Sequence, residues 1–141
     1  MALAHFGITV SQRQIARRLG YIPGAGIPTP NVVRLGQYGV QVRYAESGTL
    51  EDLERAIDRG SVVIAFVRTG ELPYWEADVP HAIVVVAVEP DAVFLDDPTF
   101  EDAPIPIPVN DFTLAWDEFG NQWACISRFS DTLKQTWEKA V

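Results

Sequence analysis

Few side chains in this sequence could carry out acid–base or nucleophilic chemistry, because it contains only two histidines and one cysteine. His81 opens the apolar run HAIVVVAV, and the adjacent residues Asp96 and Asp97 end the next short run, AVFL. A carboxylate beside a histidine fixes the tautomer of the ring and stabilises its protonated form. The pattern therefore predicts a histidine–aspartate pair in which His81 can act as a general base.

The identity of the aspartate that faces His81 depends on the turn between the two runs, at residues 89–91. Side chains on paired strands share a face only when their parities in the register agree. A three-residue turn would place Ile83 opposite Asp97 and make His81 the diagonal neighbour of Asp97, about 7–8 Å away at the backbone. A two-residue turn would place Asp96 on that face instead. The proline within the turn leaves both alternatives open.

The other nucleophilic or basic candidates are less suited to catalysis. Cys125 lies in the apolar run WACI, where a cysteine is expected to be buried and inert. His5 lies in a short helix and is expected to have a surface or packing role. Because adjacent carboxylates on a strand point to opposite faces, we expect no metal site at residues 96–97. We also expect no cofactor.

Two aromatic residues, Tyr74 and Trp75, lie in the loop that leads to His81. They could line a cleft for a peptide, or they could form an aromatic cover over the core. We treat both as candidate substrate-binding residues. The predicted site therefore consists of His81 and one of the two aspartates, Asp96 or Asp97, with Tyr74 and Trp75 in the neighbouring loop.

Capping residues and apolar periodicity predict the elements that must position these side chains. Ser11, Thr29, Thr49 and Asn110 are each expected to cap a helix. The stretch 98–108 contains four prolines and is expected to be extended and irregular. A last helix is expected at residues 130–141. Alternating or continuous apolar runs predict strands at residues 40–44, 62–67, 81–88, 92–95 and 122–129.

The order of these elements, with helices first and then a cluster of strands, predicts an α+β fold. We expect the helices to pack against one side of a largely antiparallel sheet. The length of 141 residues fits one domain. The sequence starts with MALAHF, which is typical of the end of a helix closed by Gly7. The single domain, residues 1–141, is therefore expected to lack the start of its first helix.

Composition limits the partners and the location of the protein. The net charge of −8 disfavours binding to the phosphate backbone of a nucleic acid. No stretch approaches the roughly 20 apolar residues that a membrane-spanning helix needs, so we expect no membrane insertion. The single cysteine cannot form a disulfide within the chain, which favours a reducing, cytoplasmic compartment.

Several short motifs occur in order through almost the whole sequence: MALAHFG, SQRQIARRLG, GAGIPTPNVVRLGQYGVQV, TLEDLERAIDRGSVVIAFV, LPYW, PHAIVVVAV, VFLDDP and DFTLAW. In these motifs the chain resembles the double-glycine-leader (bacteriocin-processing) peptidases and their relatives, a papain-like group of cysteine peptidases. The resemblance implies a papain-like fold and a peptide or protein segment as substrate or ligand. It also implies that His81 is the catalytic base and that Asp97 orients it.

The sequence departs from this group at the nucleophile. The resembling peptidases carry a cysteine in a Cys-Gly pair at the start of the first helix, with a glutamine a few residues earlier. Neither a cysteine nor a glutamine precedes His5 in this sequence. Because acyl-enzyme chemistry needs a thiolate, we expect the chain as written to be inactive as a peptidase.

Three interpretations follow from the missing nucleophile. The true start could lie upstream of Met1, the protein could be a non-catalytic relative that binds a peptide, or the His81–Asp97 pair could only stabilise the sheet. Loss of the first turns of the central helix would expose apolar strand surface. We therefore expect either a homo-oligomer or a misassigned start.

Overall fold

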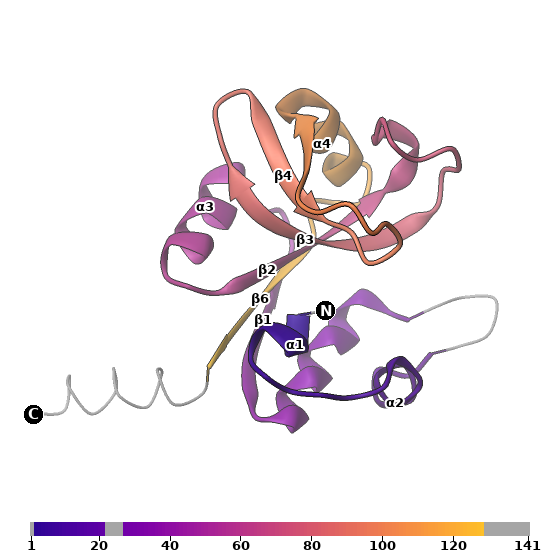
Figure 1. The fold of residues 1–141 in the computed structure, drawn as a ribbon, viewed down its shortest axis with the longest axis vertical. Coiled ribbons are helices and arrows are strands. Elements are labelled where there is room, and N and C mark those ends of the chain that lie inside the picture. Colours follow the sequence, from indigo (N-terminus) through magenta and orange to yellow (C-terminus); the bar gives the residue numbers. More distant parts are fainter. Residues whose placement is uncertain (1, 22–26, 129–141) are drawn as a thin grey trace, which may run out of the picture.

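A six-stranded antiparallel sheet organises the protein (Figure 1). The computed structural model describes residues 2–21 and 27–128. The strands lie in the order β1-β6-β2-β3-β4-β5. Together with the helices, this sheet confirms the predicted α+β class. The bounds of the strands are β1 Val40–Ala45, β2 Val62–Arg68, β3 Pro80–Val88, β4 Ala92–Asp96, β5 Ile105–Pro108 and β6 Trp123–Arg128.

The helices cover both faces of the sheet (Figure 1). On one face, the α3/α4 face, lie α3 (Leu50–Asp58) and α4 (Val109–Asp117). The opposite face, the α1/η1 face, is covered by α1 (Ala2–His5), α2 (Gln12–Arg18) and the 3-10 helix η1 (Thr29–Tyr38). The expectation that helices pack against one side only is wrong. The central strand β2 is apolar and buried throughout residues 62–67, so both of its faces need cover.

Two of the predicted helix starts are confirmed by their capping geometry. The side chain of Ser11 accepts a hydrogen bond from Gln14 N at 3.1 Å, and the side chain of Thr49 accepts one from Asp52 N at 3.2 Å. In both cases the third residue of the helix bonds back to the backbone of the cap, which completes a capping box. The starts of α2 and α3 are therefore fixed by local sequence.

The other two predicted caps are wrong. Pro28 is the N-cap residue of η1, and Thr29 instead donates its hydroxyl hydrogen to Gln122 Oε1 at 2.6 Å. Pro108 precedes α4, so Asn110 lies inside the first turn of that helix. A contact with a residue 93 positions away has overridden the local preference of Thr29 for a cap.

The proline-rich stretch that was predicted to be irregular contains an edge strand. Strand β5 pairs with β4, and its residues Pro106 and Pro108 lie opposite Phe94 and Ala92. Proline is tolerated at a sheet edge because the missing N–H can face away from the ladder. A short 3-10 helix, η2 (Thr69–Glu71), lies between β2 and β3. The helix predicted at 130–141 lies outside the described residues.

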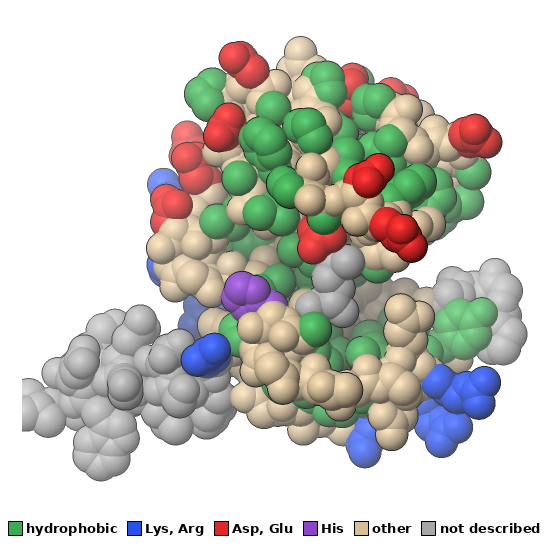
Figure 2. All heavy atoms as spheres, in the orientation of Figure 1, with side chains coloured by type: hydrophobic (Ala, Val, Ile, Leu, Met, Phe, Trp, Pro, Cys, Tyr) green, Lys and Arg blue, Asp and Glu red, His purple; other side chains and the backbone are tan. Residues whose placement is uncertain are grey.

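Charge is divided unequally between the first third of the chain and the rest. Residues 1–45 contain five arginines and no acidic residue, whereas all 19 aspartates and glutamates lie beyond them. Acidic side chains accordingly gather on the upper part of the molecule in Figure 2, and arginines flank the lower part. In residues 2–21 and 27–128, no helix has the length and apolar character needed to cross a membrane.

Candidate active site

His81 and Asp97 contact each other directly, with 2.8 Å between His81 Nε2 and Asp97 Oδ1. His81 is the second residue of β3, and Asp97 follows the last residue of β4. The side chain of Asp97 is fully buried, whereas 18% of the His81 side chain is exposed. One edge of the imidazole ring therefore reaches a buried carboxylate while another part of the ring stays accessible.

The hairpin between β3 and β4 has a two-residue turn. Glu89 N donates to Ala92 O at 2.9 Å, so only residues 90–91 lie in the turn. The next paired residues are Val88 and Val93. The alternative with a three-residue turn is therefore wrong. By itself, a two-residue turn would have brought Asp96 to the face of His81.

A β-bulge at Val86 changes this outcome. The register shifts by one residue at this position, so that Val84 pairs with Asp96. One residue further along, Ile83 lies opposite Asp97, and His81 becomes the diagonal neighbour of Asp97 on the same face. The bulge thus restores the register that a three-residue turn would have given, and Asp97 rather than Asp96 meets the histidine.

Each oxygen of the Asp97 carboxylate has two hydrogen-bonding partners. Oδ1 contacts His81 Nε2 and accepts from the backbone N–H of Thr99 at 3.0 Å. Oδ2 accepts from the hydroxyl of Tyr74 at 2.8 Å and from the indole N–H of Trp75 at 3.0 Å. The polar atoms of both aromatic residues are therefore engaged by Asp97. Contact of their rings with a peptide stays a prediction.

These partners decide the charge of Asp97. Burial alone would raise the pKa of this carboxyl, but hydrogen bonds from His81, Trp75, Thr99 and Tyr74 outweigh burial and lower the pKa. The contact between Asp97 and Tyr74 acts in the opposite direction on Tyr74. Burial of its hydroxyl, the hydrogen bond to Asp97 and the negative charge of Asp97 raise the pKa of Tyr74. Asp97 is therefore ionised and Tyr74 neutral near neutral pH.

The aromatic rings around the pair hold it in place. The centroids of the Trp75 and His81 rings are 4.9 Å apart. Phe100 packs edge-to-face against Tyr74 at 5.0 Å and against Trp75 at 5.4 Å, which joins the loop before β3 to the loop after β4. Phe100 and Thr99 were missed by the reasoning from sequence. The Asp-Pro-Thr run gave a signal for Thr99, since an aspartate often accepts from the N–H two residues on.

The geometry defines the tautomer that a neutral His81 adopts. An ionised Asp97 can only accept, so Nε2 carries the hydrogen that points to Oδ1. Nδ1 is then the nitrogen with a free lone pair. A histidine oriented in this way can accept a proton from a nucleophile placed near Nδ1.

Comparison with known proteins assigns the sequence to a family. Residues 28–132 match the sequence profile of the Peptidase_C39 like family. The chain belongs to this family. A similar fold, with a TM-score of 0.70, occurs in the crystal structure of a proposed C39-like peptidase from Bacillus anthracis. The two are 17% identical, and the match covers 91% of this chain and 84% of the other. No curated protein matches the chain.

Cys125 does not lie near the histidine of this C39-like domain. Val63 of β2 pairs with Cys125 of β6, and Val67 of β2 pairs with His81 of β3. The two residues are therefore separated by roughly 13 Å along the strands and by a further two strand spacings, roughly 10 Å, across the sheet. Burial raises the pKa of the Cys125 thiol, although nearby Arg43 and Arg59 partly oppose the rise. The thiol is therefore buried, protonated and out of reach of His81 Nδ1.

The remaining histidine, His5, belongs to a helix on the opposite face of the sheet from the pair. It lies on α1, which covers the α1/η1 face, and its ring packs edge-on against Phe6.

His81 itself is one of the residues that line an apolar groove of about 490 Å³. The groove runs between η1 and β2, and its other lining residues include Ile27, Leu35, Phe66 and Phe119.

Proposed function

We propose that this domain binds a peptide segment beside His81 and that the 141 residues do not hydrolyse it on their own. The observation that supports this proposal most directly is the distribution of the catalytic parts. His81 and Asp97 lie 2.8 Å apart, which suits a base and the carboxylate that orients it, while the single cysteine lies four residues away along β2 and two strands across the sheet. A base without a nucleophile can bind and polarise a peptide but cannot form an acyl-enzyme.

The groove next to His81 supports a peptide ligand. Its volume of about 490 Å³ falls within the usual range for ligand sites, and its walls are mainly apolar. An extended peptide could place an apolar side chain in this groove and a backbone carbonyl near the imidazole. The expected ligand is therefore a peptide with apolar side chains.

Calorimetry and mass spectrometry with one panel of such peptides test both parts of the proposal. We expect binding without cleavage. Ile27→Lys, which puts a charge into the groove, should abolish binding, whereas Val33→Lys should not, because Val33 is exposed and does not line the groove. Absence of binding across the panel would contradict the peptide-binding part. Cleavage that disappears in Cys125→Ser would contradict the non-catalytic part.

A second candidate function is peptide hydrolysis with a thiol supplied from outside residues 1–141. The orientation of His81 favours it, since Nε2 is held by Asp97 and Nδ1 is left to receive a proton. The reading frame upstream of Met1 provides the test. If it encodes a Cys-Gly pair preceded by a glutamine, the extended protein should cleave peptides and lose this activity in His81→Ala. A stop codon immediately upstream would remove this candidate.

A further inference from the structure

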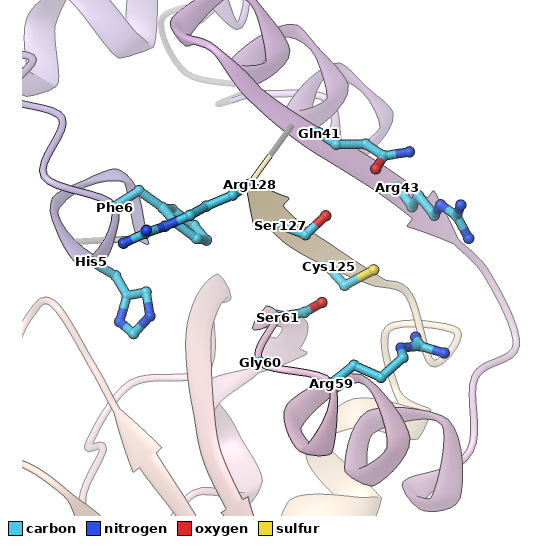
Figure 3. A pocket seen from close by; sticks show the side chains of 10 residues that line it. All are labelled: His5, Phe6, Gln41, Arg43, Arg59, Gly60, Ser61, Cys125, Ser127 and Arg128. Atoms are coloured by element: carbon cyan, nitrogen blue, oxygen red, sulfur yellow. The ribbon is translucent and has the colours of Figure 1, made fainter. Parts of the chain in front are cut away.

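A second pocket lies at the other end of the sheet and has no role in the function proposed above. Unlike the groove beside His81, it is polar, and we call it the Cys125 pocket after the cysteine in its lining. It has a volume of about 410 Å³. Cys125 and Ser127 of β6 contribute to it, together with Ser61 just before β2. Figure 3 shows the two hydroxyl groups and the thiol pointing to the same side. These three side chains form a floor that can donate hydrogen bonds.

Two arginines from different elements lie beside this floor. Arg43 belongs to β1 and is paired with Cys125 across the β1–β6 ladder, and Arg59 is the C-cap residue of α3. In Figure 3 both extend to the same side as the thiol and the hydroxyls. Both are close enough to act on the thiol, because each lowers the pKa of Cys125 against the effect of burial. Two positively charged side chains therefore line the same pocket as the thiol.

These charges have no counterpart within the described part of the chain. The ion pairs there involve Arg55, Arg68 and His81, and neither Arg43 nor Arg59 takes part in one. Among residues 2–21 and 27–128, no carboxylate lines the pocket. An arginine at a helix C-terminus such as Arg59 is expected from the helix dipole. Arg43 on an edge strand has no such explanation.

We propose that the Cys125 pocket binds the phosphate group of a small phosphorylated molecule. Two guanidinium groups and two hydroxyls offer more donors than a single carboxylate can accept, and arginine is well matched to phosphate oxygens. The pocket is also larger than a phosphate ion, so the rest of the ligand has room beside it. Arg128, His5 and Phe6, which lie on the other side of β6 in Figure 3, complete the lining.

Titration calorimetry at constant ionic strength tests this proposal with inorganic phosphate and phenyl phosphate as probes and acetate as the control anion. We expect at least one phosphate probe to bind and acetate not to bind. Arg43→Gln/Arg59→Gln should weaken binding at least about tenfold, as expected for loss of charge-assisted contacts. Arg13→Gln/Arg34→Gln removes the same charge from exposed positions outside the pocket and should leave binding unchanged.

The two probes also identify the source of the phosphate. Binding of both probes indicates a site for the phosphate group itself, whereas binding of phenyl phosphate alone indicates an organic phosphate. The proposal is wrong if neither probe binds, or if both double variants weaken binding equally. Neither result bears on the peptide groove, because the peptide experiments use different residues and different ligands.

Cys125 provides an independent readout, since it is the single cysteine of the chain. Phosphate bound at the floor of the pocket should slow alkylation of the thiol by iodoacetamide. The protection should disappear in Arg43→Gln/Arg59→Gln and persist in Arg13→Gln/Arg34→Gln. Equal alkylation rates with and without the phosphate probes in the wild-type protein would overturn the proposal.

Discussion

The His81–Asp97 cluster and the Cys125 pocket lie on the same face of one sheet, yet they compensate their charges in opposite ways. The Asp97 carboxylate is buried, and each of its oxygens has two partners from the chain itself. At the Cys125 pocket, Arg43 and Arg59 line the same cavity, and no carboxylate of the described residues lines it with them. A cluster of the first kind stabilises the fold whether or not a ligand is present. In the second cluster, no acidic side chain of residues 2–21 and 27–128 pairs with either arginine, which is why we propose a ligand as the counter-charge.

The largest expected effect is the loss of the Asp97 carboxylate. Asp97→Ala leaves four hydrogen-bonding groups without their acceptor in a buried site, so the free energy of unfolding should fall by about 3–5 kcal/mol. Asp96→Ala is the matched control, because Asp96 points to the opposite face, and it should cost no more than about 0.5 kcal/mol. Urea denaturation measures both. Similar losses in the two variants would mean that the network around Asp97 contributes little.

The next largest effect should be the loss of stability at acidic pH. The folded protein lowers the pKa of Asp97, so this group adds stability above its unfolded pKa of about 3.9. The contribution should be lost as the pH falls through the lower, folded value. Unfolding free energies of the wild type and Asp97→Asn, measured from neutral to acidic pH, should therefore converge at low pH. Parallel curves would show that the charge of Asp97 does not provide the stabilisation.

Removal of a single donor from the network should have a smaller effect. Tyr74→Phe deletes the hydroxyl that donates to Asp97 Oδ2 but keeps the ring against Phe100, so we expect a loss of about 1 kcal/mol. Tyr21→Phe, at an exposed position, should have no effect. Thermal denaturation of the two variants decides the matter, and a Tyr74→Phe protein as stable as the wild type would contradict the assigned role.

The smallest effect on stability is expected at the Cys125 pocket. Arg43→Gln/Arg59→Gln should change the free energy of unfolding by no more than about 0.5 kcal/mol, since both side chains are exposed and unpaired in the described structure. The same double variant should raise the pKa of Cys125 further, because both arginines lower it. The pH profile of iodoacetamide alkylation should move to higher pH. A large loss of stability would mean that these arginines serve the fold.

The sequence was sufficient to predict the histidine–aspartate pair but not the strand register that brings the two side chains together. His81 begins one predicted strand and Asp96 and Asp97 end the next, so the partner of His81 had to be one of these two aspartates. The register of the strands left the choice open, and the resemblance to the leader peptidases selected Asp97. The bulge could not be predicted, because Val86 lies within an uninterrupted run of valines and carries no local signal. Three-dimensional register, rather than composition, determines which valine is left unpaired.

The parts of the fold that depend on distant contacts were predicted less well. Thr29 has the residue type of a helix cap, but Gln122 takes its hydroxyl. The Cys125 pocket combines side chains from β1, α3 and β6, which are separated by up to about two thirds of the chain. None of these residues is distinctive in isolation. Local patterns predict helices and strands, whereas this pocket could be predicted only if the order of the strands in the sheet were known.

The bulge at Val86 has a consequence for how this hairpin can vary in length. Deleting Val86 alone would turn Asp97 away from His81 and present Asp96, while inserting one residue into the turn at the same time would restore the original pairing. Sixteen positions separate His81 from Asp97. Relatives that keep this separation can use turns of different shape, so insertions and deletions in the hairpin should occur in compensating pairs.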